Sequence, residues 1–361
     1  MRQPAVRCLS RAPAPRVRGR GGLPTPAYGD AMSKRYLVTG GSGFIGSHLV
    51  EALTARGDRV VVLDDGSTGD AGNLAALAGH PGLQRVVGSV CDELVVDETM
   101  AGVDGVFHLA AAVGVTRILE RKVASIVTNL RGTEVVLRAA WAHGGVPVFL
   151  ASSSEVYGKL DKVPFREEDD SVLGATSLHR WSYACAKAMD EYLALAYHAE
   201  RGLPVFIGRF FNVTGPRQSP HYGMVLPRLC QAAREGRPLE VYGDGRQTRC
   251  FLHVADCVRA VLALVDTPAA LGQVVNIGGG EEIAIADLAE LVRAETGAAA
   301  PVRYVPYAEA YPQGGFEDMR RRVPDTTRLT RLTGWRQSRD LRAIVRECAG
   351  QFERRAGAGT P

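Results

Sequence analysis

Short apolar runs alternate with amphipathic stretches over the first half of the chain. The run RYLVTG, which begins at Arg35, has the pattern of a short buried strand, and the GSGFIGSHLVEALTARG that follows has helical spacing and ends at Gly57. The alternation continues through RVVVLDD, LQRVVGSV, GVFHLAA and VPVFLASSS, with the helical IVTNLRGTEVVLRAAWAHGG between the last two. Apolar strands alternating with helices predict a parallel sheet covered by helices on both faces. Ligands of such sheets bind at the carboxyl ends of the strands.

The regular alternation loosens near residue 210, and proline and glycine become denser beyond it. HVADCVRAVLALVDTP and ADLAELVRAETG have the spacing of amphipathic helices and carry no candidate chemistry. We therefore expect a doubly wound α/β domain over 33–209. A smaller C-terminal α/β portion over 210–355 is expected to be partly interleaved with it.

The first 31 residues differ in composition from the rest. They contain six arginines and a single acid, Asp30, are rich in proline and glycine, and show no apolar periodicity. We expect residues 1–32 to form a disordered tail. An Arg-rich, acid-poor start is also typical of a transit peptide, although the prolines argue against the amphipathic helix such a peptide needs. A third interpretation is that translation begins at Met32.

Composition excludes several classes of protein. Hydrophobic residues make up 46% of the chain and charged residues 23%, with a formal net charge of +4. No apolar run is long enough to span a bilayer, and the seven scattered cysteines indicate free thiols in a reducing, cytoplasmic compartment. No C-x-x-C or H-E-x-x-H motif is present, so no metal site is expected.

A glycine-rich turn follows the first predicted strand. In TGGSGFIGSHL, Gly40, Gly43 and Gly46 have the spacing that permits a tight turn, close approach of a pyrophosphate to backbone N–H groups, and close packing of the helix. Asp64 ends the second strand 18 residues after Gly46. A carboxylate there binds the adenosine ribose hydroxyls and repels a 2′-phosphate, so NAD is expected rather than NADP; the alternative is a strand-end turn residue.

Further residues are assigned to the dinucleotide site. Asp92, after the third strand, is expected to accept a hydrogen bond from the adenine amino group, with a solvated loop acid as the alternative. The remaining expected cofactor contacts are Phe44, Ile45, Leu109, Ala110 and Asn129, together with Lys187, which can reach the nicotinamide ribose.

The stretch RWSYACAKAMDEY places Tyr183 and Lys187 four residues apart on a predicted helix, and therefore on one face. A tyrosine has a pKa of about 10. A neighbouring ammonium group and a positively charged nicotinamide would lower it towards the working range of a general base. A hydroxyl from Ser152 or Ser153 would hold the substrate oxygen beside Tyr183. An incidental surface pair is the alternative, which the dinucleotide motif disfavours.

Several motifs occur in the order typical of a known family: TGGSGFIGSHL, VVVLDD, VFHLAA, SSSEVYG, Tyr-x-x-x-Lys and FFNVTGPR. Over roughly 33–350 the chain resembles the extended short-chain dehydrogenases/reductases, which include the NAD-dependent nucleotide-sugar epimerases, dehydratases and decarboxylases. The resemblance implies a Rossmann-type domain, a C-terminal portion that holds a UDP-sugar, and a homodimer formed through a helix bundle. It also implies that Tyr183 takes the proton from the sugar C4 hydroxyl while the hydride passes to NAD+.

Two segments resemble one branch of this family. SSSEVYG is similar to the S-T-S-E-V-Y-G of UDP-glucuronate decarboxylases, with Ser153 for threonine, and implies that Glu155 moves a proton near the sugar C5. RRRVPDTTRL resembles their R-x-P-[DS] segment, which implies that Arg322 meets the sugar carboxylate. The alternatives are a surface acid for Glu155 and a solvated or diphosphate-binding patch for Arg320, Arg321 and Arg322.

The expected reaction is therefore decarboxylation of UDP-glucuronate to UDP-xylose. UDP-sugar 4-epimerisation stays open, because GRPLEVYGDGRQTRCFLHVADCV resembles 4-epimerases equally well. Dehydratases carry Asp in place of Ser154. RWSYACAK resembles UDP-apiose/UDP-xylose synthases, but these carry Cys at that position, which disfavours ring contraction. A non-catalytic NAD-binding regulator and a nucleic-acid binder are alternatives outside this class; neither nucleic acid nor membrane is an expected partner.

Three residues of the second half are assigned to the substrate. Asn212 in FFNVTGPR is expected to reach a sugar or phosphate oxygen, or else to serve a structural turn. Arg249 in RQTRCF is expected to meet the diphosphate, since arginine pairs with phosphate bidentately. Tyr242 is expected to lie against the uracil ring, with core packing as the alternative.

Overall fold

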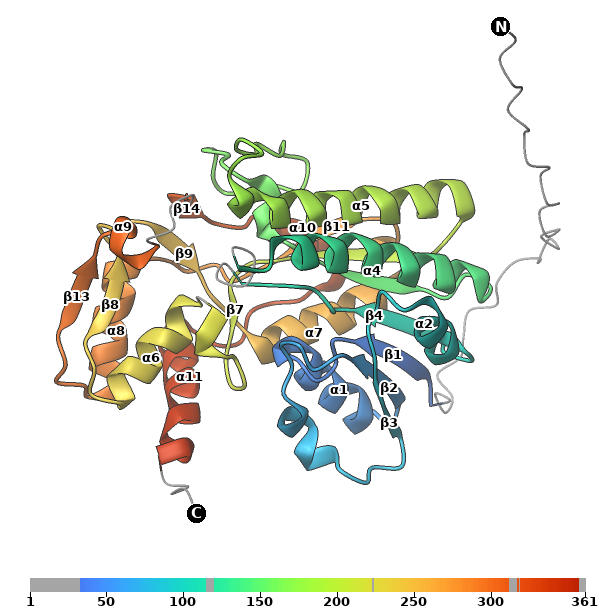
Figure 1. Cartoon of the computed structure of the whole chain (residues 1–361), viewed down its shortest axis with the longest axis horizontal. Helices are drawn as coiled ribbons and strands as arrows, with labels where there is room; N and C mark the ends of the chain where they lie inside the picture. The colour runs from blue at the N-terminus through green and yellow to red at the C-terminus, as the bar shows by residue number, and fades with distance from the viewer. Residues whose placement is uncertain (1–32, 115–119, 223, 312–316, 318, 357–361) are drawn as a thin grey trace, which may run out of the picture. The chain divides into compact units, whose positions relative to one another are not determined.

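Seven parallel strands form the central sheet (Figure 1). The computed structural model describes residues 33–356 except 115–119, 223, 312–316 and 318, so the predicted tail lies outside the described residues. The strand order is β11-β6-β5-β4-β1-β2-β3, with every neighbouring pair parallel. The strands are β1 (Arg35–Thr39), β2 (Arg59–Asp64), β3 (Leu83–Val87), β4 (Gly105–His108), β5 (Val148–Ser153), β6 (Val205–Phe210) and β11 (Val274–Ile277).

The strands bury side chains on both faces, as their apolar sequences predict. In β2, Val60 and Val62 belong to one hydrophobic cluster, whereas Val61 and Leu63 belong to another on the opposite face. Two layers of helices, one on each face, pack on the sheet and complete these clusters (Figure 1). The first face carries α1 (Phe44–Ala55), α7 (Val254–Val265) and α10 (Thr327–Thr333), and the second carries α2 (Glu93–Met100), α4 (Lys122–Ala142) and α5 (Ser182–Arg201). The prediction of a doubly wound parallel α/β sheet is confirmed.

The order of the strands reverses between β1 and β4. From β1 the chain builds outwards through β2 and β3, then returns to add β4, β5 and β6 on the other side. The connections after β1 and β4 therefore diverge and leave a crevice at the carboxyl ends of the strands, which is where open α/β sheets bind ligands.

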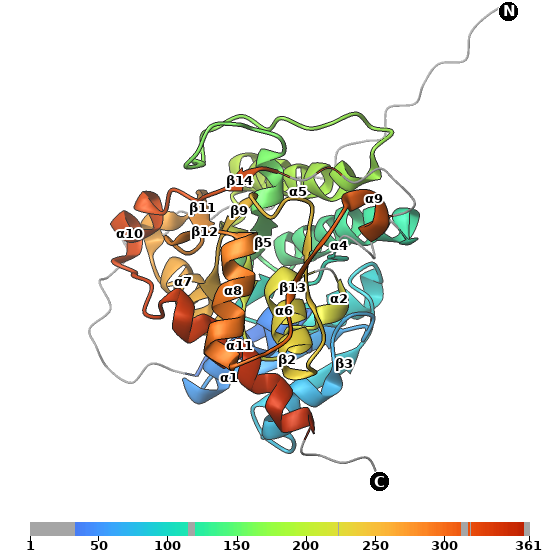
Figure 2. The same cartoon turned by 90° about the vertical axis from the view of Figure 1, so that its left-hand side faces the viewer.

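The second half adds three small sheets and a separate core. Strand β9 lies between β12 and β14, and the pairs β10–β7 and β13–β8 form the other sheets. Helices α6, α8 and α11 pack together around their own hydrophobic cluster (Figure 2). Strand β11 from this half joins the main sheet, so the two halves interleave. The elements are β7 (Val213–Thr214), α6 (Val225–Arg234), β8 (Leu239–Tyr242), β9 (Thr248–Cys250), β10 (Leu252–His253), β12 (Glu282–Ala284), α8 (Ile285–Thr296), β13 (Val302–Val305), α9 (Tyr307–Ala310), β14 (Arg321–Arg322) and α11 (Leu341–Ala356).

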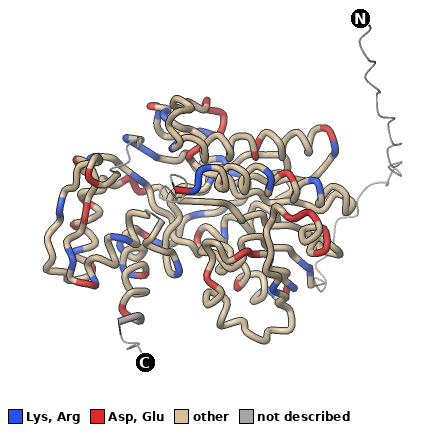
Figure 3. Tube along the Cα trace, viewed as in Figure 1, with Lys and Arg blue, Asp and Glu red and all other residues tan. Residues whose placement is uncertain are grey.

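Acidic and basic residues are interspersed along the described chain (Figure 3). Along the same ranges, no helix combines the length and the apolar composition that crossing a membrane requires. Nor do three or more His, Cys, Asp or Glu side chains of the described residues gather in a way that would hold a metal ion.

Candidate active site

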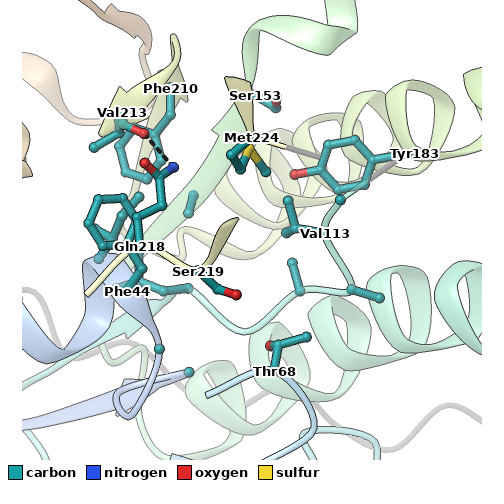
Figure 4. A pocket seen from close by; sticks show the side chains of 18 of the residues that line it. Phe44, Thr68, Val113, Ser153, Tyr183, Phe210, Val213, Gln218, Ser219 and Met224 are labelled. Carbon is teal, nitrogen blue, oxygen red and sulfur yellow. Dashed lines mark hydrogen bonds between the residues drawn. The ribbon is translucent and has the colours of Figure 1, made fainter. Parts of the chain in front are cut away.

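A cavity of about 720 Å³ lies at the carboxyl ends of the central strands and extends against the second half of the chain. Both halves contribute side chains to its wall (Figure 4). The structure brings most of the predicted site residues together there: Gly40, Gly43, Phe44, Ile45, Gly46, Asp64, Leu109, Ala110, Ser153, Glu155, Tyr183, Lys187, Asn212, Tyr242, Arg249 and Arg322.

The glycine turn between β1 and α1 forms one wall of this cavity. Gly40 has a φ of +72°, and a Cβ added to it would lie 2.8 Å from the Ala110 backbone nitrogen. A Cβ at Gly46 would lie 2.1 Å from the Gly40 carbonyl oxygen, so both glycines are required by the turn itself. Gly43 differs, because its backbone is extended and its added Cβ would meet only that oxygen, at 3.1 Å. The turn thus leaves room beside Gly43 for a pyrophosphate at the N-terminus of α1.

Asp64 lies at the end of β2, with its carboxylate held by backbone donors. One oxygen accepts a hydrogen bond from Ser42 N at 3.0 Å, and the other accepts from Gly66 N at 2.8 Å. The carboxylate is thereby fixed on the cavity wall. The glycine turn has room for a pyrophosphate, and the Asp64 carboxylate can accept hydrogen bonds from ribose hydroxyls. The two together fit a dinucleotide with free ribose hydroxyls.

Asp92 and Asn129 lie outside the cavity wall, and the expectation that they contact the cofactor stays a prediction. The Asp92 carboxylate caps α2, accepting from Leu94 N at 3.1 Å and Val95 N at 3.4 Å. Asn129 is buried on α4, where its side-chain oxygen accepts from Ala112 N at 2.7 Å and its amide donates to Ala112 O. Asn129 therefore fixes the backbone of the segment after β4, whose residues do line the cavity.

Tyr183 and Lys187 lie one helical turn apart on α5, and both face the cavity. The Tyr183 ring borders the cavity in Figure 4. Ser153 hydrogen-bonds Tyr183, whereas the buried Ser152 hydroxyl donates to Glu191. Of the two candidate serines, the structure therefore places Ser153 beside Tyr183.

The balance of charges around Tyr183 differs from the sequence expectation. Burial raises the pKa of Tyr183, and the Lys187 ammonium lowers it by less, so the net shift is upwards. Lys187 thus acts in the expected direction, but in the protein without its cofactor burial outweighs it. A further positive charge is needed before Tyr183 can act as a base near neutral pH.

Glu155 lies between two arginines on the cavity wall. Arg180 Nη1 lies 2.5 Å from one carboxylate oxygen and Arg322 Nη2 lies 2.6 Å from the other. Burial raises the pKa of Glu155, but the charges of Arg322 and Arg180 outweigh it and hold that pKa at about 2. With a side chain only 13% exposed, Glu155 is not a surface acid. It is ionised at neutral pH, so the resting protein keeps no proton on it to give to a sugar.

The three consecutive arginines of the C-terminal segment do not form one patch. Arg321 is exposed and pairs with Glu282 at 2.7 Å. Arg322 is buried, with 8% of its surface exposed, and lines the cavity. The side chains alternate along β14, which sends only Arg322 towards the site.

Two side chains on this wall were not assigned from the sequence. Arg180 is 4% exposed, and its guanidinium also lies 5.1 Å from the Trp181 ring centre. Its position three residues before Tyr183, at the entrance to the same helix, was the available signal. Ser154 lines the cavity, is 1% exposed, and its hydroxyl has no hydrogen-bond partner among the described residues.

The residues from the second half hold the far wall. Asn212, with a φ of +34°, donates to Cys250 O at 2.9 Å, and Arg249 donates to the carbonyls of Thr248 and Met319 at 2.7 and 2.9 Å. The Arg228 guanidinium lies 4.0 Å from the Tyr242 ring centre. The roles of Asn212, Arg249 and Tyr242 towards a nucleotide stay predictions.

Comparisons with known proteins agree with this geometry. A model of the NAD dependent epimerase/dehydratase family matches residues 36–278. The chain is 43% identical to UDP-N-acetyl-alpha-D-glucosaminuronate decarboxylase of Bacillus cytotoxicus, over 83% of this chain and 92% of that protein. It is 37% identical to dTDP-glucose 4,6-dehydratase of Streptomyces griseus, over 86% of this chain and 91% of that protein.

Solved structures give the same result. The UDP-glucose 4-epimerase of Thermotoga maritima with UDP-glucose has a TM-score of 0.80 at 28% identity, covering 89% of this chain and 99% of that one. The dTDP-glucose 4,6-dehydratase of Streptomyces venezuelae with NAD and TYD bound has a TM-score of 0.81 at 30% identity, covering 90% and 98%. The chain therefore belongs to the NAD-dependent epimerase/dehydratase family, as an enzyme of nucleotide-sugar chemistry with NAD as its cofactor.

Proposed function

We propose that the protein decarboxylates a UDP-linked uronic acid, with UDP-glucuronate going to UDP-xylose. The observation that carries this proposal is the pair of buried arginines, Arg180 and Arg322, which together hold the Glu155 carboxylate on the cavity wall. A guanidinium presents a planar fork of donors that matches a carboxylate. The guanidinium groups of Arg180 and Arg322 can also bind the carboxylate of a uronic acid, either together with Glu155 or in its place.

The similarity to a uronate decarboxylase at 43% identity supports this choice. That relative is named for an N-acetylated uronic acid, so a 2-acetamido sugar is the second substrate to test. UDP-glucuronic acid decarboxylase 1 of Xenopus tropicalis is a further relative, at 32% identity over 84% of this chain. Ser154 supports the choice as well, because a hydroxyl stands where dehydratases carry a carboxylic acid.

Catalysis begins at Tyr183. Its phenolate takes the proton of the sugar C4 hydroxyl, which Ser153 helps to hold, and Lys187 stabilises the negative charge. Bound NAD supplies the acceptor, and later the donor, of the C4 hydride. A uronic acid oxidised at C4 is a β-keto acid: its C5–C6 bond breaks, CO2 leaves, and the electron pair remains at C5.

A proton must then be added at C5. Glu155 starts ionised because Arg322 and Arg180 hold its pKa at about 2. A substrate carboxylate that draws those guanidinium groups away weakens this stabilisation and raises the pKa of Glu155. Glu155 can therefore take up a proton only after a uronic acid has bound, which couples its protonation to the correct substrate.

UDP-hexose 4-epimerisation is the second candidate, favoured by the similarity to UDP-glucose 4-epimerase at a TM-score of 0.80. The two reactions share the Tyr183 step and differ in the use of the arginine pair. UDP-glucose has no carboxylate at C6 to engage Arg180 and Arg322, whereas a 4-epimerase of UDP-glucuronate would engage them without releasing CO2.

We also propose that two copies associate through α4 and α5. These helices pack against each other and expose apolar side chains on the same side of the sheet. Val123, Val127 and Leu130 are 77%, 46% and 37% exposed on α4, and Met189 and Tyr192 are 50% and 70% exposed on α5. A four-helix bundle would bury them. Light scattering should give the mass of a dimer, and a Val127→Glu variant should give that of a monomer.

The direct test supplies UDP-glucuronate, and in parallel UDP-N-acetylglucosaminuronate, to the NAD-loaded protein. Decarboxylation releases CO2 and a UDP-sugar lighter by one carboxyl group, which mass spectrometry detects. Interconversion of UDP-glucose and UDP-galactose without CO2 release from either uronate would establish the epimerase instead.

A further inference from the structure

The Lys187 ammonium group lies against a buried carboxylate on its own helix. Lys187 Nζ donates to Asp190 Oδ2 at 3.1 Å, and the two residues are 2% and 1% exposed. Neither the similarity nor the expected chemistry requires an acid three residues after the lysine. A buried carboxylate is costly unless it has a partner, so this one calls for a physical reason.

Two adjacent carboxylates on α5 serve different cations. Glu191 pairs with Arg209 through two contacts, at 2.7 and 2.9 Å, and accepts from Ser152. Asp190 instead holds Lys187. The network around Glu191 joins β5, β6 and α5 and supports the scaffold, whereas Asp190 acts on a residue of the site.

Lys187 is the cation that pairs with Asp190, and the other groups that the structure describes around this carboxylate carry no positive charge. The Thr133 hydroxyl of α4 faces Asp190, and on its other side lies 3.2 Å from His108 Nε2. His108 Nδ1 lies 2.8 Å from the Thr39 hydroxyl of β1. Burial, helped by the charge of Lys187, lowers the pKa of His108 to about 3, so this imidazole is neutral. The ionisable groups facing the pair are Tyr183, Glu191 and His108, and Glu155 faces Tyr183 in turn.

We propose that Asp190 is a positioning residue, which fixes the Lys187 ammonium beneath Tyr183 and limits how strongly that charge stabilises the tyrosinate. Burial alone would lower the pKa of Lys187, but Asp190, Tyr183 and Glu191 together outweigh it and the net shift is upwards. The same negative charge works against ionisation of Tyr183. Asp190 thus delays loss of the Tyr183 proton until the positive charge of the cofactor is present.

Tyr183 and Lys187 serve both candidate reactions, so the proposed role of Asp190 is the same whether the sugar is decarboxylated or epimerised. Its test can therefore omit the sugar. In the NAD-bound protein, tyrosinate absorbance is titrated against pH, and the signal of Tyr183 is isolated by subtracting the same variant carrying Tyr183→Phe. Asp190→Asn should lower the Tyr183 midpoint by about one pH unit, since it removes a nearby negative charge. Asp190→Glu, which keeps the charge, should restore the midpoint.

The matched control is Asp256→Asn. Asp256 is also fully buried, accepts from the Ser338 and Arg339 backbone nitrogens at 3.1 Å each, and lies outside the cavity wall. That variant should lower the melting temperature without moving the Tyr183 midpoint. If Asp190→Asn fails to fold, Asp190→Ser provides a smaller neutral side chain with the same expected shift. A midpoint that stays in place or rises in a folded neutral variant would overturn the proposal.

Discussion

The cavity has two walls of different construction. The wall formed by the glycine turn consists largely of backbone. A Cβ added to Gly40 or Gly46 would come within 2.8 or 2.1 Å of a backbone atom, so neither position has room for a side chain. Asp64 on this wall is held by backbone N–H groups. The opposite wall consists of charged side chains from three segments distant in the chain, with Glu155 bound to Arg180 and Arg322. The first wall is rigid before any ligand arrives, while the second can exchange its ion pairs. Recognition of a constant cofactor suits the first construction, and discrimination among sugars suits the second.

Tyr183 lies where the two walls meet, so its removal has the largest expected effect. Tyr183→Phe deletes one oxygen and little volume, and should lower kcat by ~10²–10⁴ because the initiating proton transfer loses its base. NAD and UDP-sugar binding, measured by calorimetry, should stay close to wild type. A variant that keeps kcat within a factor of a few would remove Tyr183 from the reaction.

Gly43→Val tests the backbone wall. Its added Cβ would meet only the Gly40 carbonyl oxygen at 3.1 Å, and the extended backbone accepts any residue. We therefore expect a folded protein that no longer binds NAD, because the branched side chain occupies the approach of the pyrophosphate. Gly46→Val is the contrast: its Cβ would collide with Gly40 O at 2.1 Å, so the turn itself should fail and the melting temperature should fall. Normal NAD affinity in Gly43→Val would contradict this assignment.

Arg322→Ala tests the charged wall. If the substrate is a uronic acid, losing this contact should weaken UDP-glucuronate binding on the order of 2–5 kcal/mol and leave UDP-glucose binding nearly unchanged. Arg321→Ala is the matched control, because the neighbouring side chain is exposed and pairs with Glu282. Calorimetry with both nucleotide sugars gives the two affinities. Equal losses for both sugars would assign Arg322 to the nucleotide instead.

The ion pairs of this wall also predict a pH dependence of stability. The folded pKa of Glu155, about 2, lies below its ordinary value of 4.5, so the stabilisation is complete above pH 4.5 and is lost as the pH falls towards 2. Glu155→Gln should melt at a lower temperature than wild type at pH 7, because it leaves two buried guanidinium groups without this carboxylate. The difference in melting temperature should shrink between pH 4.5 and 2. A constant difference over that range would show that Glu155 does not carry this charge interaction.

The two walls also differ in how far the sequence predicts them. The glycine turn is contiguous, and its chemistry resides in spacing, so Gly40, Gly43, Gly46 and Asp64 follow from the order of residues. The charged wall requires β14 to approach the segment that follows β5, a tertiary contact that no local pattern encodes. Arg322 was reached only by resemblance, and Arg180 was missed. Asp92 shows the same limit, because its place after a strand does not distinguish a ligand contact from the helix cap that the structure shows there.

The smallest expected effect concerns Asp64, the acidic side chain on the backbone wall. Its two oxygens are held by Ser42 N and Gly66 N at 3.0 and 2.8 Å, so the carboxylate would meet a ribose in a fixed orientation. A carboxylate accepts from both ribose hydroxyls and repels a 2′-phosphate. Asp64→Ala should therefore weaken the affinity for NAD by roughly tenfold, because a charge-assisted hydrogen bond is lost. It should also reduce the difference in affinity between NAD and NADP. Asp65→Ala, one residue further along, is the control and should leave the ratio of the two affinities in place. An unchanged ratio in Asp64→Ala would mean that selectivity arises from the shape of the glycine turn alone, and that the backbone wall needs no charged side chain to choose its ligand.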